Sequence, residues 1–415
     1  MHALSASGSL GHHLRTMSGV NISDAAAHER RQGLGWAWFE ALFSYILQPL
    51  ACLKTHPESF YHGMRLLAVD GSQWSLRNTA ANIAQTAVRH HNQKATASAF
   101  LKWGSAVLLE VGTHQPLAAA CVQEGLDHEE GEINIARRVL SGIPQGEDTL
   151  LLADRLYGCG RFICDVQAAA GARSQVLVRV GSSRKVTLVR VLSDGSAVIE
   201  VRVCRPGSTR TERTLTLREV RGQVSRDHSE NNKKVETLVK ATEVRLWTTL
   251  LDEIEYPGLE LLALYAQRWE QELFFRELKR HTGREQLLRA GSVAGAQAEY
   301  GAMIIAASLL AEQRVRAAEQ VGLPPTRLSI TKISRAMEAL LPMLSVAGNI
   351  LSSRQREKII ARFLVHTARE ARIPPRRARS CQRGLRKPDC AWPRIFSRVY
   401  LDGSCLYALS HTTFP

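Results

Sequence analysis

Three carboxylate side chains stand where together they could hold metal ions for phosphoryl chemistry. Asp70 follows the apolar run of residues 66–69, and Asp154 follows that of residues 150–153. Both runs have the composition of short buried β-strands, so each aspartate is predicted at the C-terminal end of a strand, from which it can reach an open cleft. Glu272 lies in a helical pattern. Carboxylates are the ligands that hard divalent cations such as Mg²⁺ prefer, so the three residues predict a metal-dependent site.

Four side chains of different chemistry recur at helical intervals around Glu272. Tyr265, Arg268, Glu272 and Lys279 are separated by three, four and seven residues. At 100° per residue they fall within an arc of about 60°, so one face of a helix predicted over residues 257–281 presents all four to one place. Taken singly, Arg268 and Glu272 would be an ordinary surface ion pair, and each aspartate an ordinary turn residue. Their coincidence in one chain favours a nuclease-type site.

The spacing Tyr-x2-Arg-x3-Glu-x6-Lys is the YREK signature, and with it the chain resembles the DDE transposases of bacterial insertion sequences, in particular the insertion-sequence-four-type family. The Asp-Gly-Ser segment at 70–72 is similar to the first aspartate motif of that family, and Ala-Asp-Arg at 153–155 is similar to the second. The resemblance covers roughly residues 22–395. It departs from the family at Leu156, where a Gly is usual.

The resemblance implies a set of catalytic residues that bind two Mg²⁺ ions, for which Mn²⁺ can substitute: Asp70, Asp154 and Glu272. Two such ions would promote in-line displacement at a phosphodiester without a covalent protein intermediate. The other residues of the signature carry donors that suit DNA phosphate oxygens and would position the substrate: Tyr265, Arg268 and Lys279. The implied reaction is cleavage at insertion-sequence ends, through a DNA hairpin in relatives, followed by strand transfer into target DNA.

Two further interpretations remain open at the level of sequence. Trp269 is a candidate for stacking on a displaced base, against the alternative of core packing. The whole chain could instead be a catalytically inactive, transposase-derived DNA-binding protein, although the intact carboxylates at 70, 154 and 272 favour activity. An RNase H-like nuclease of another purpose is weakened by the YREK signature.

The order of strand and helix patterns predicts the α/β class and, with the resemblance, an RNase H-like catalytic core. Between residues 184 and 249 the hydrophobic period becomes two, which predicts an all-β insertion between the second aspartate and the glutamate. Helical N- and C-terminal regions complete the fold. We expect four parts: a helical N-terminal region at 1–60, with its completeness and DNA binding left open; a catalytic core at 61–183 and 250–345; the β-strand insertion at 184–249; and a basic C-terminal region at 346–415.

The composition favours a polyanionic partner. Lys and Arg number 54 against 39 Asp and Glu, which gives a net charge of +15. Positive side chains that neutralise DNA phosphates release the condensed counterions, and this release favours association. The expected partner is therefore double-stranded DNA, both terminal inverted repeats and target DNA, bound by a homodimer. No apolar run approaches the about 18 residues that span a bilayer, and the N-terminus lacks the pattern of a secretion signal. We therefore expect a cytoplasmic, nucleoid-associated protein with no membrane partner.

Two segments have less specific patterns. Residues 354–387 contain twelve Lys or Arg and two Glu, which predicts phosphate contacts over a merely solvated tail. Residues 24–53 are predicted to be helical, with an aromatic cluster that forms a buried face; order is expected to begin near Ser23.

Overall fold

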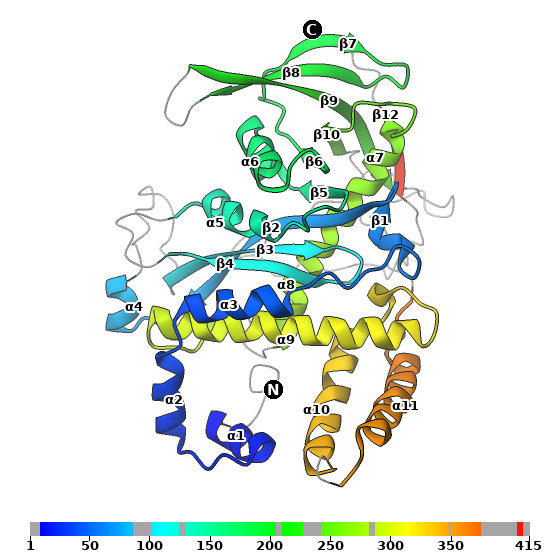
Figure 1. Ribbon diagram of the computed structural model, residues 1–415. Helices are drawn as coiled ribbons and strands as arrows, with labels where there is room; N and C mark the ends of the chain where they lie inside the picture. The colour runs from blue at the N-terminus through cyan, green and yellow to red at the C-terminus, as the bar shows by residue number, and fades with distance from the viewer. Residues whose placement is uncertain are drawn as a thin grey trace, which may run out of the picture. The chain divides into compact units, whose positions relative to one another are not determined.

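The computed structural model describes residues 9–85, 101–123, 130–204, 210–226, 242–281, 287–347, 350–374 and 405–409 (Figure 1). The chain divides into two compact units. The first comprises residues 1–156, 162–175 and 267–373, and the second comprises residues 157–161, 176–266 and 374–415. Both units combine strands with helices, so the predicted α/β class is confirmed.

The first unit is built on a mixed sheet with the strand order β4-β3-β2-β5. Strands β2, β3 and β4 form an antiparallel meander, and β5 pairs with β2 in parallel. Two short strands add to β2, of which β1 is antiparallel and β11 parallel. The strands are β1 (Phe60–Tyr61), β2 (Met64–Leu76), β3 (Leu101–Glu110), β4 (Gln115–Cys121), β5 (Thr149–Ala153) and β11 (Leu287–Leu288). The β5 range is the one that the sequence predicted.

Helices pack around this sheet. They are α1 (Leu10–Ser18), α2 (Asp24–Gln32), α3 (Trp36–Ile46), α4 (Ala80–Gln85), α5 (Glu132–Val139), α8 (Trp269–His281), α9 (Val293–Glu319), α10 (Ile330–Ala347) and α11 (Ser353–Ala371), with α6 (Gly160–Ala170) beginning in the second unit and continuing in the first. Short 3-10 helices are η1 (Pro57–Ser59), η2 (Leu140–Gly142), η3 (Arg155–Tyr157), η4 (Ala266–Arg268) and η5 (Pro325–Arg327). Within the described ranges, only α9 is long and apolar enough to cross a membrane, and most of it is buried as a core helix.

The second unit contains an antiparallel sheet with the order β6-β10-β9-β8-β7, and β12 pairs with β9. Its elements are β6 (Ser174–Arg179, whose first two residues belong to the first unit), β7 (Thr187–Val191), β8 (Ala197–Cys204), β9 (Thr211–Arg226), β10 (Thr242–Thr248), β12 (Cys405–Leu409) and α7 (Gly258–Tyr265). In β8 Ile199, Val201 and Val203 are buried whereas Glu200 and Arg202 are exposed, as the period of two predicted. The β7–β8 turn needs Gly195 because its φ is +82°.

The N-terminal region differs from the prediction in two ways. Order begins earlier than Ser23, because α1 starts at Leu10 with Ser9 as its N-cap. The helix predicted over residues 24–53 is two helices, because Gly33 caps the end of α2 and Gly35 the start of α3.

The aromatic face of α3 is also narrower than predicted. Phe39 and Phe43 are buried, whereas Trp38 and Tyr45 are exposed. Trp36 is half-buried and stacks at 6.1 Å on Tyr300 of α9, so the helix still packs through aromatic side chains.

Only part of the basic C-terminal segment lies within the described residues, and residues 375–404 fall outside them. The described part is α11, which packs into a core cluster through Leu364, Ala368 and Ala371. Four basic side chains of α11 are exposed: Arg354, Lys358, Arg362 and Arg369. At 100° per residue these four fall within about 80° of one another, on a different side of the helix from the buried residues.

Candidate active site

Asp70 lies inside strand β2 and not at its end, which corrects the sequence prediction. The strand continues to Leu76 because β3 pairs with it as far as Leu101. Strand β5 pairs with the other edge of β2 only as far as Ala153, which is opposite Val69. Asp70 is therefore the first residue of β2 beyond the end of its parallel neighbour, and this provides the opening that the prediction attributed to a strand end.

Asp154 directly follows β5, as predicted. The parallel register sets Ala153 opposite Val69, so the next residue on each strand is one of the two aspartates. The backbone N–H of Leu156 donates to Asp154 Oδ1 at 2.6 Å, and that of Gly71 donates to Asp70 Oδ1 at 2.9 Å. Burial and the negative charge of Asp154 are the two largest causes that raise the pKa of Asp70 to about 7. The two carboxylates are thus near enough to repel each other.

The single helix predicted over residues 257–281 is also wrong. Helix α7 ends at Tyr265, the 3-10 turn η4 follows, and α8 begins at Trp269. Tyr265 belongs to the second unit, whereas Arg268, Glu272 and Lys279 belong to the first. One regular α-helical face therefore does not carry all four residues of the signature. Residues 282–286, which follow α8, lie outside the described residues.

Arg268 links Glu272 to Asp70. Its guanidinium donates to Glu272 Oε1 at 2.7 Å and lies 3.6 Å from Asp70 Oδ2. All three side chains are largely buried, with 14% of Arg268, 17% of Asp70 and 29% of Glu272 exposed. The positive charge of Arg268 opposes the rise in the pKa of Asp70 but does not cancel it. The structure thus brings together Asp70, Asp154, Arg268 and Glu272 in the first unit.

A fourth carboxylate, missed by the sequence analysis, lies at the same place. Glu132 is the first residue of α5, and its charge also raises the pKa of Asp70. A Cβ on Gly71 would lie 2.3 Å from the carboxyl carbon of Glu132, so this side chain rests directly over the glycine. No local motif marks Glu132; only the tertiary packing of α5 on the meander brings it near Asp70.

Lys279 lies two turns beyond Glu272 on α8. Its ammonium donates to the backbone carbonyl of Gln73 at 3.2 Å and lies 5.2 Å from the centre of the Trp74 ring. Burial, and then repulsion by Lys102, lower the pKa of Lys279 to about 8. These surroundings destabilise the ammonium form of Lys279, and a nearby anion such as a phosphate would stabilise it.

The donor atoms at this site are of the kind that a divalent cation takes. Hard carboxylate oxygens of Asp70, Asp154 and Glu132 repel one another, and a cation would neutralise that repulsion. In the part of the chain that the structure describes, no group of three or more His, Cys, Asp or Glu side chains is arranged to enclose a metal. At this site the Glu272 carboxylate accepts a hydrogen bond from the guanidinium of Arg268.

The remaining predicted residue, Trp269, is the first residue of α8 and is half-buried. It follows Arg268 in sequence, and it is not one of the exposed large hydrophobic residues in the described part of the chain. Whether it stacks on a base therefore remains a prediction.

The opposite face of α8 carries a second cluster of charges. Glu270 and Glu277 both bond to His114, at 2.7 Å from Nε2 and 2.8 Å from Nδ1. Arg314 of α9 lies 3.4 Å from Glu277 and also donates to the backbone carbonyl of Thr113. His114 is 2% exposed and Arg314 is fully buried, whereas the side chains of Glu270 and Glu277 keep 20% and 19% of their surface exposed.

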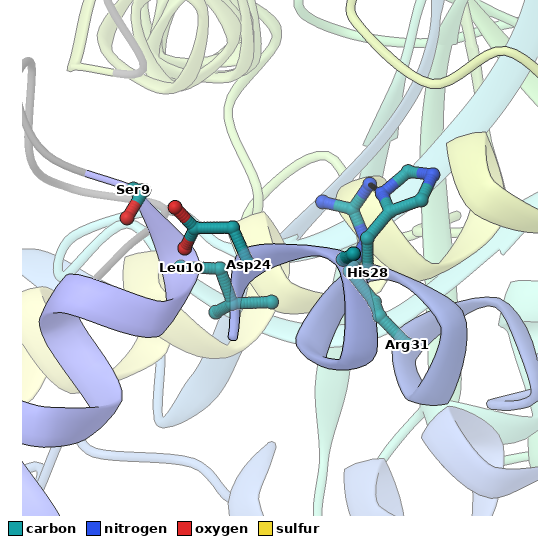
Figure 2. Close-up of a pocket in the computed structure, with 6 residues that line it drawn as sticks. Ser9, Leu10, Asp24, His28 and Arg31 are labelled. Carbon is teal, nitrogen blue, oxygen red and sulfur yellow. Dashed lines mark hydrogen bonds between the residues drawn. The ribbon is translucent and has the colours of Figure 1, made fainter. Parts of the chain in front are cut away.

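A surface hollow of about 450 Å³ lies between α1 and α2 (Figure 2). It is lined by Ser9, Leu10, Asp24, Ala25, His28 and Arg31. Its polar groups are already used: Gly11 N–H donates to Asp24 at 2.9 Å, and the Arg31 guanidinium lies 3.2 Å from His28 Nδ1. None of the predicted site residues lines it, and its contacts join the two helices.

Two aspartates carried by neighbouring strands thus lie beside Arg268 of η4 and Glu272 of α8. The family model described as the transposase DDE domain matches residues 61–309, so the chain belongs to this family. A curated relative is the transposase InsG for insertion sequence element IS4 of Escherichia coli strain K12, which is 24% identical over 383 residues, or 90% of this chain and 78% of the relative. The resemblance to insertion-sequence-four-type DDE transposases is thereby confirmed.

Among solved structures, the chain is similar to the piggyBac transposase in a synaptic complex with hairpin DNA. The TM-score is 0.37 with 9% sequence identity, over 72% of this chain and 57% of the piggyBac chain.

Proposed function

We propose that this transposase cleaves DNA at insertion-sequence ends and joins the freed ends to target DNA, with Asp70, Asp154 and Glu272 as its catalytic carboxylates. The observation that carries the proposal is the parallel register of β2 and β5, which puts the two aspartates side by side, with Arg268 joining Asp70 to Glu272. Intact carboxylates at all three positions argue against an inactive DNA-binding descendant.

The same three carboxylates are the proposed ligands for two Mg²⁺ ions or for Mn²⁺ in their place. When bound, such ions stabilise the attacking and leaving oxygens of a phosphodiester displacement. A cation held by Glu272 would compete with the guanidinium of Arg268 for this carboxylate. The guanidinium would then be released to a DNA phosphate, which it suits as a planar fork.

We propose that Lys279 and Tyr265 also contact phosphates. For Lys279 the support is an ammonium whose lowered pKa would be restored by an anion. For Tyr265 the support is the YREK signature alone. Trp269 remains a candidate for base stacking, and a hairpin intermediate a candidate step of a cut-and-paste reaction.

We infer an RNase H-like core for the first unit, supported by its meander, helix α5, parallel strand β5 and helix α6 in that order. The antiparallel strands β7 to β10 are the proposed all-β insertion between Asp154 and Glu272. The proposed partners are terminal inverted repeats and target DNA, bound by a homodimer in the cytoplasm at the nucleoid.

Neutral substitutions of the carboxylates test the proposed catalysis. Asp70→Asn, Asp154→Asn and Glu272→Gln are each expected to lower Mg²⁺-dependent nicking of end-containing DNA by at least roughly a hundredfold, because each removes a charge that the ions need. End binding should remain within about twofold. Asp165→Asn, which removes an aspartate of α6 paired with Arg137 at 2.7 Å, is the matched control. Wild-type rates in any of the three variants would contradict the assignment.

Arg268→Ala separates positioning from binding. We expect cleavage of bound DNA to slow by roughly ten- to a hundredfold, since charge-assisted phosphate contacts contribute about 1.5–3 kcal/mol. Single-turnover cleavage at saturating protein measures this step. Weaker end binding with an unchanged cleavage rate would make Arg268 a docking residue.

The exposed basic face of α11 tests the DNA partner. Removing the chain after Ser353 would delete a core helix, so we prefer Gln at Arg354, Lys358, Arg362 and Arg369 together, all of which are exposed. If these residues contact phosphates, the slope of log K against log salt should flatten by roughly 2 to 4. Glu357→Gln on the same helix is the control, and equal slopes for all three proteins would assign α11 to solvent.

A further inference from the structure

His114 occupies a strained position between β3 and β4. Its φ is +58°, in the left-handed region that favours glycine, and its backbone N–H donates to the Glu110 carbonyl at 3.0 Å. A residue other than glycine at such a φ needs contacts that compensate the backbone strain. Here those contacts are the two carboxylates of α8, at 2.7 Å and 2.8 Å.

The two hydrogen bonds hold both ring nitrogens of His114 to α8. The guanidinium of Arg314, from α9, lies against Glu277 and adds a further contact to the same face of the helix. His114 and Arg314 are buried, and the side chains of Glu270 and Glu277 are 20% and 19% exposed, so the cluster is largely shielded from solvent.

The geometry of α8 connects this cluster to the catalytic carboxylate. Glu270 and Glu277 are seven residues apart, so they lie on one face, about 10 Å apart along the helix axis. Glu272 is 200° around the helix from Glu270 and points to the opposite side. A helix fixed at two points on one face can neither rotate nor slide, and this fixes the carboxylate on the other face.

We propose that His114 is a positioning residue for catalysis, because its two hydrogen bonds to α8 fix the rotation of this helix and thereby the place of Glu272 beside Asp70. This inference rests on the proposed function of Glu272. A rotation of about 10° moves a carboxylate about 6 Å from the helix axis by about 1 Å. A misplacement of that size can cost about a hundredfold in rate. No local pattern marks this histidine, because its partners are 156 and 163 residues away in the sequence.

His114→Gln tests the proposal, with His56→Gln as the matched control. His56 is also a buried histidine of the first unit, and its Nε2 lies 3.6 Å from Glu319, but its partner is not on α8. We expect both variants to be less stable, and only His114→Gln to slow single-turnover cleavage, by roughly ten- to a hundredfold, with end affinity unchanged within about twofold. Hydrogen exchange should accelerate in α8 only in His114→Gln.

Glu270→Gln provides a second variant that keeps the size of the side chain and leaves the bond from His114 to Glu277 intact. It should slow cleavage in the same direction, and the double variant with His114→Gln should lose less than the product of the two effects. Equal losses of rate in His114→Gln and His56→Gln, or unchanged exchange in α8, would overturn the inference. Absence of cleavage by the wild-type protein would instead contradict the proposed function, while the exchange measurement would still test the fixing of α8.

Discussion

Helix α8 carries acidic residues on two opposite faces, and their surroundings differ in one respect. On the face of Glu270 and Glu277, the two carboxylates contact His114 and Arg314 in a largely buried cluster. On the face of Glu272, Arg268 is the cation paired with Asp70 and Glu272, and Asp154 and Glu132 add further negative charge near Asp70. Both carboxylates of the first cluster have partners within the protein. The second cluster has an excess of negative charge, which a bound cation would neutralise.

The largest effect should come from breaking the first cluster. Glu277→Gln leaves Arg314 and His114 buried with one anion fewer, so we expect the free energy of unfolding to fall by about 2–4 kcal/mol. Urea denaturation measures it. Glu312→Gln, which breaks an exposed pair with Arg316 on α9, is the control and should change stability by less than about 0.5 kcal/mol. If Glu277→Gln lowered the free energy of unfolding as little as Glu312→Gln does, the cluster around Glu277 would not be a stabilising one.

A change of opposite sign is expected at the second cluster. The pKa of Asp70 in the folded protein, about 7, lies above its unfolded value, so ionisation of Asp70 opposes folding. The penalty is absent below about pH 4, grows as the pH rises towards 7 and is complete above it. Metal-free Asp70→Asn should therefore be more stable than wild type at pH 8, by up to about 4 kcal/mol, and equal to it near pH 4.

Divalent cations sharpen the same measurement. Mg²⁺ or Mn²⁺ should raise the melting temperature of the wild-type protein and not that of Asp70→Asn, because a ligand stabilises only the form that binds it. A destabilised Asp70→Asn, or equal responses of both proteins to metal, would contradict the excess of negative charge.

The smallest effect concerns Lys279. Because burial lowers its pKa to about 8, the ammonium is lost as the pH rises from 7 to 9, and a phosphate contact is lost with it. End affinity should fall by roughly three- to tenfold over that interval, and less in Lys279→Met. The stability contribution has the opposite sign: it rises between about pH 8 and 10.5, because the unfolded chain holds the proton more tightly. Parallel pH profiles for the two proteins would exclude Lys279 from the DNA contact.

Local sequence patterns were enough to predict β5, the place of Asp154 directly after it and the alternation in β8, because each depends on a few neighbouring residues. Two features depend on pairing with distant segments and could not be read locally. Strand β2 passes Asp70 because β3 continues beside it, and Glu132 approaches Gly71 because α5 packs on the meander. The 3-10 turn η4 was missed for another reason: residues 266–268 have ordinary helix-forming composition, and nothing in them marks the interruption.

The parallel register of β2 and β5 also limits which changes of chain length this protein could accept. Side chains alternate across a sheet, so removal or addition of one residue within β5 would turn Asp154 to the opposite face while leaving most of the strand apolar. Between the two strands, by contrast, the connecting segments can lengthen or shorten without moving either aspartate. Single-residue indels in residues 150–153 should therefore be far more damaging than indels in the turn at residues 144–146.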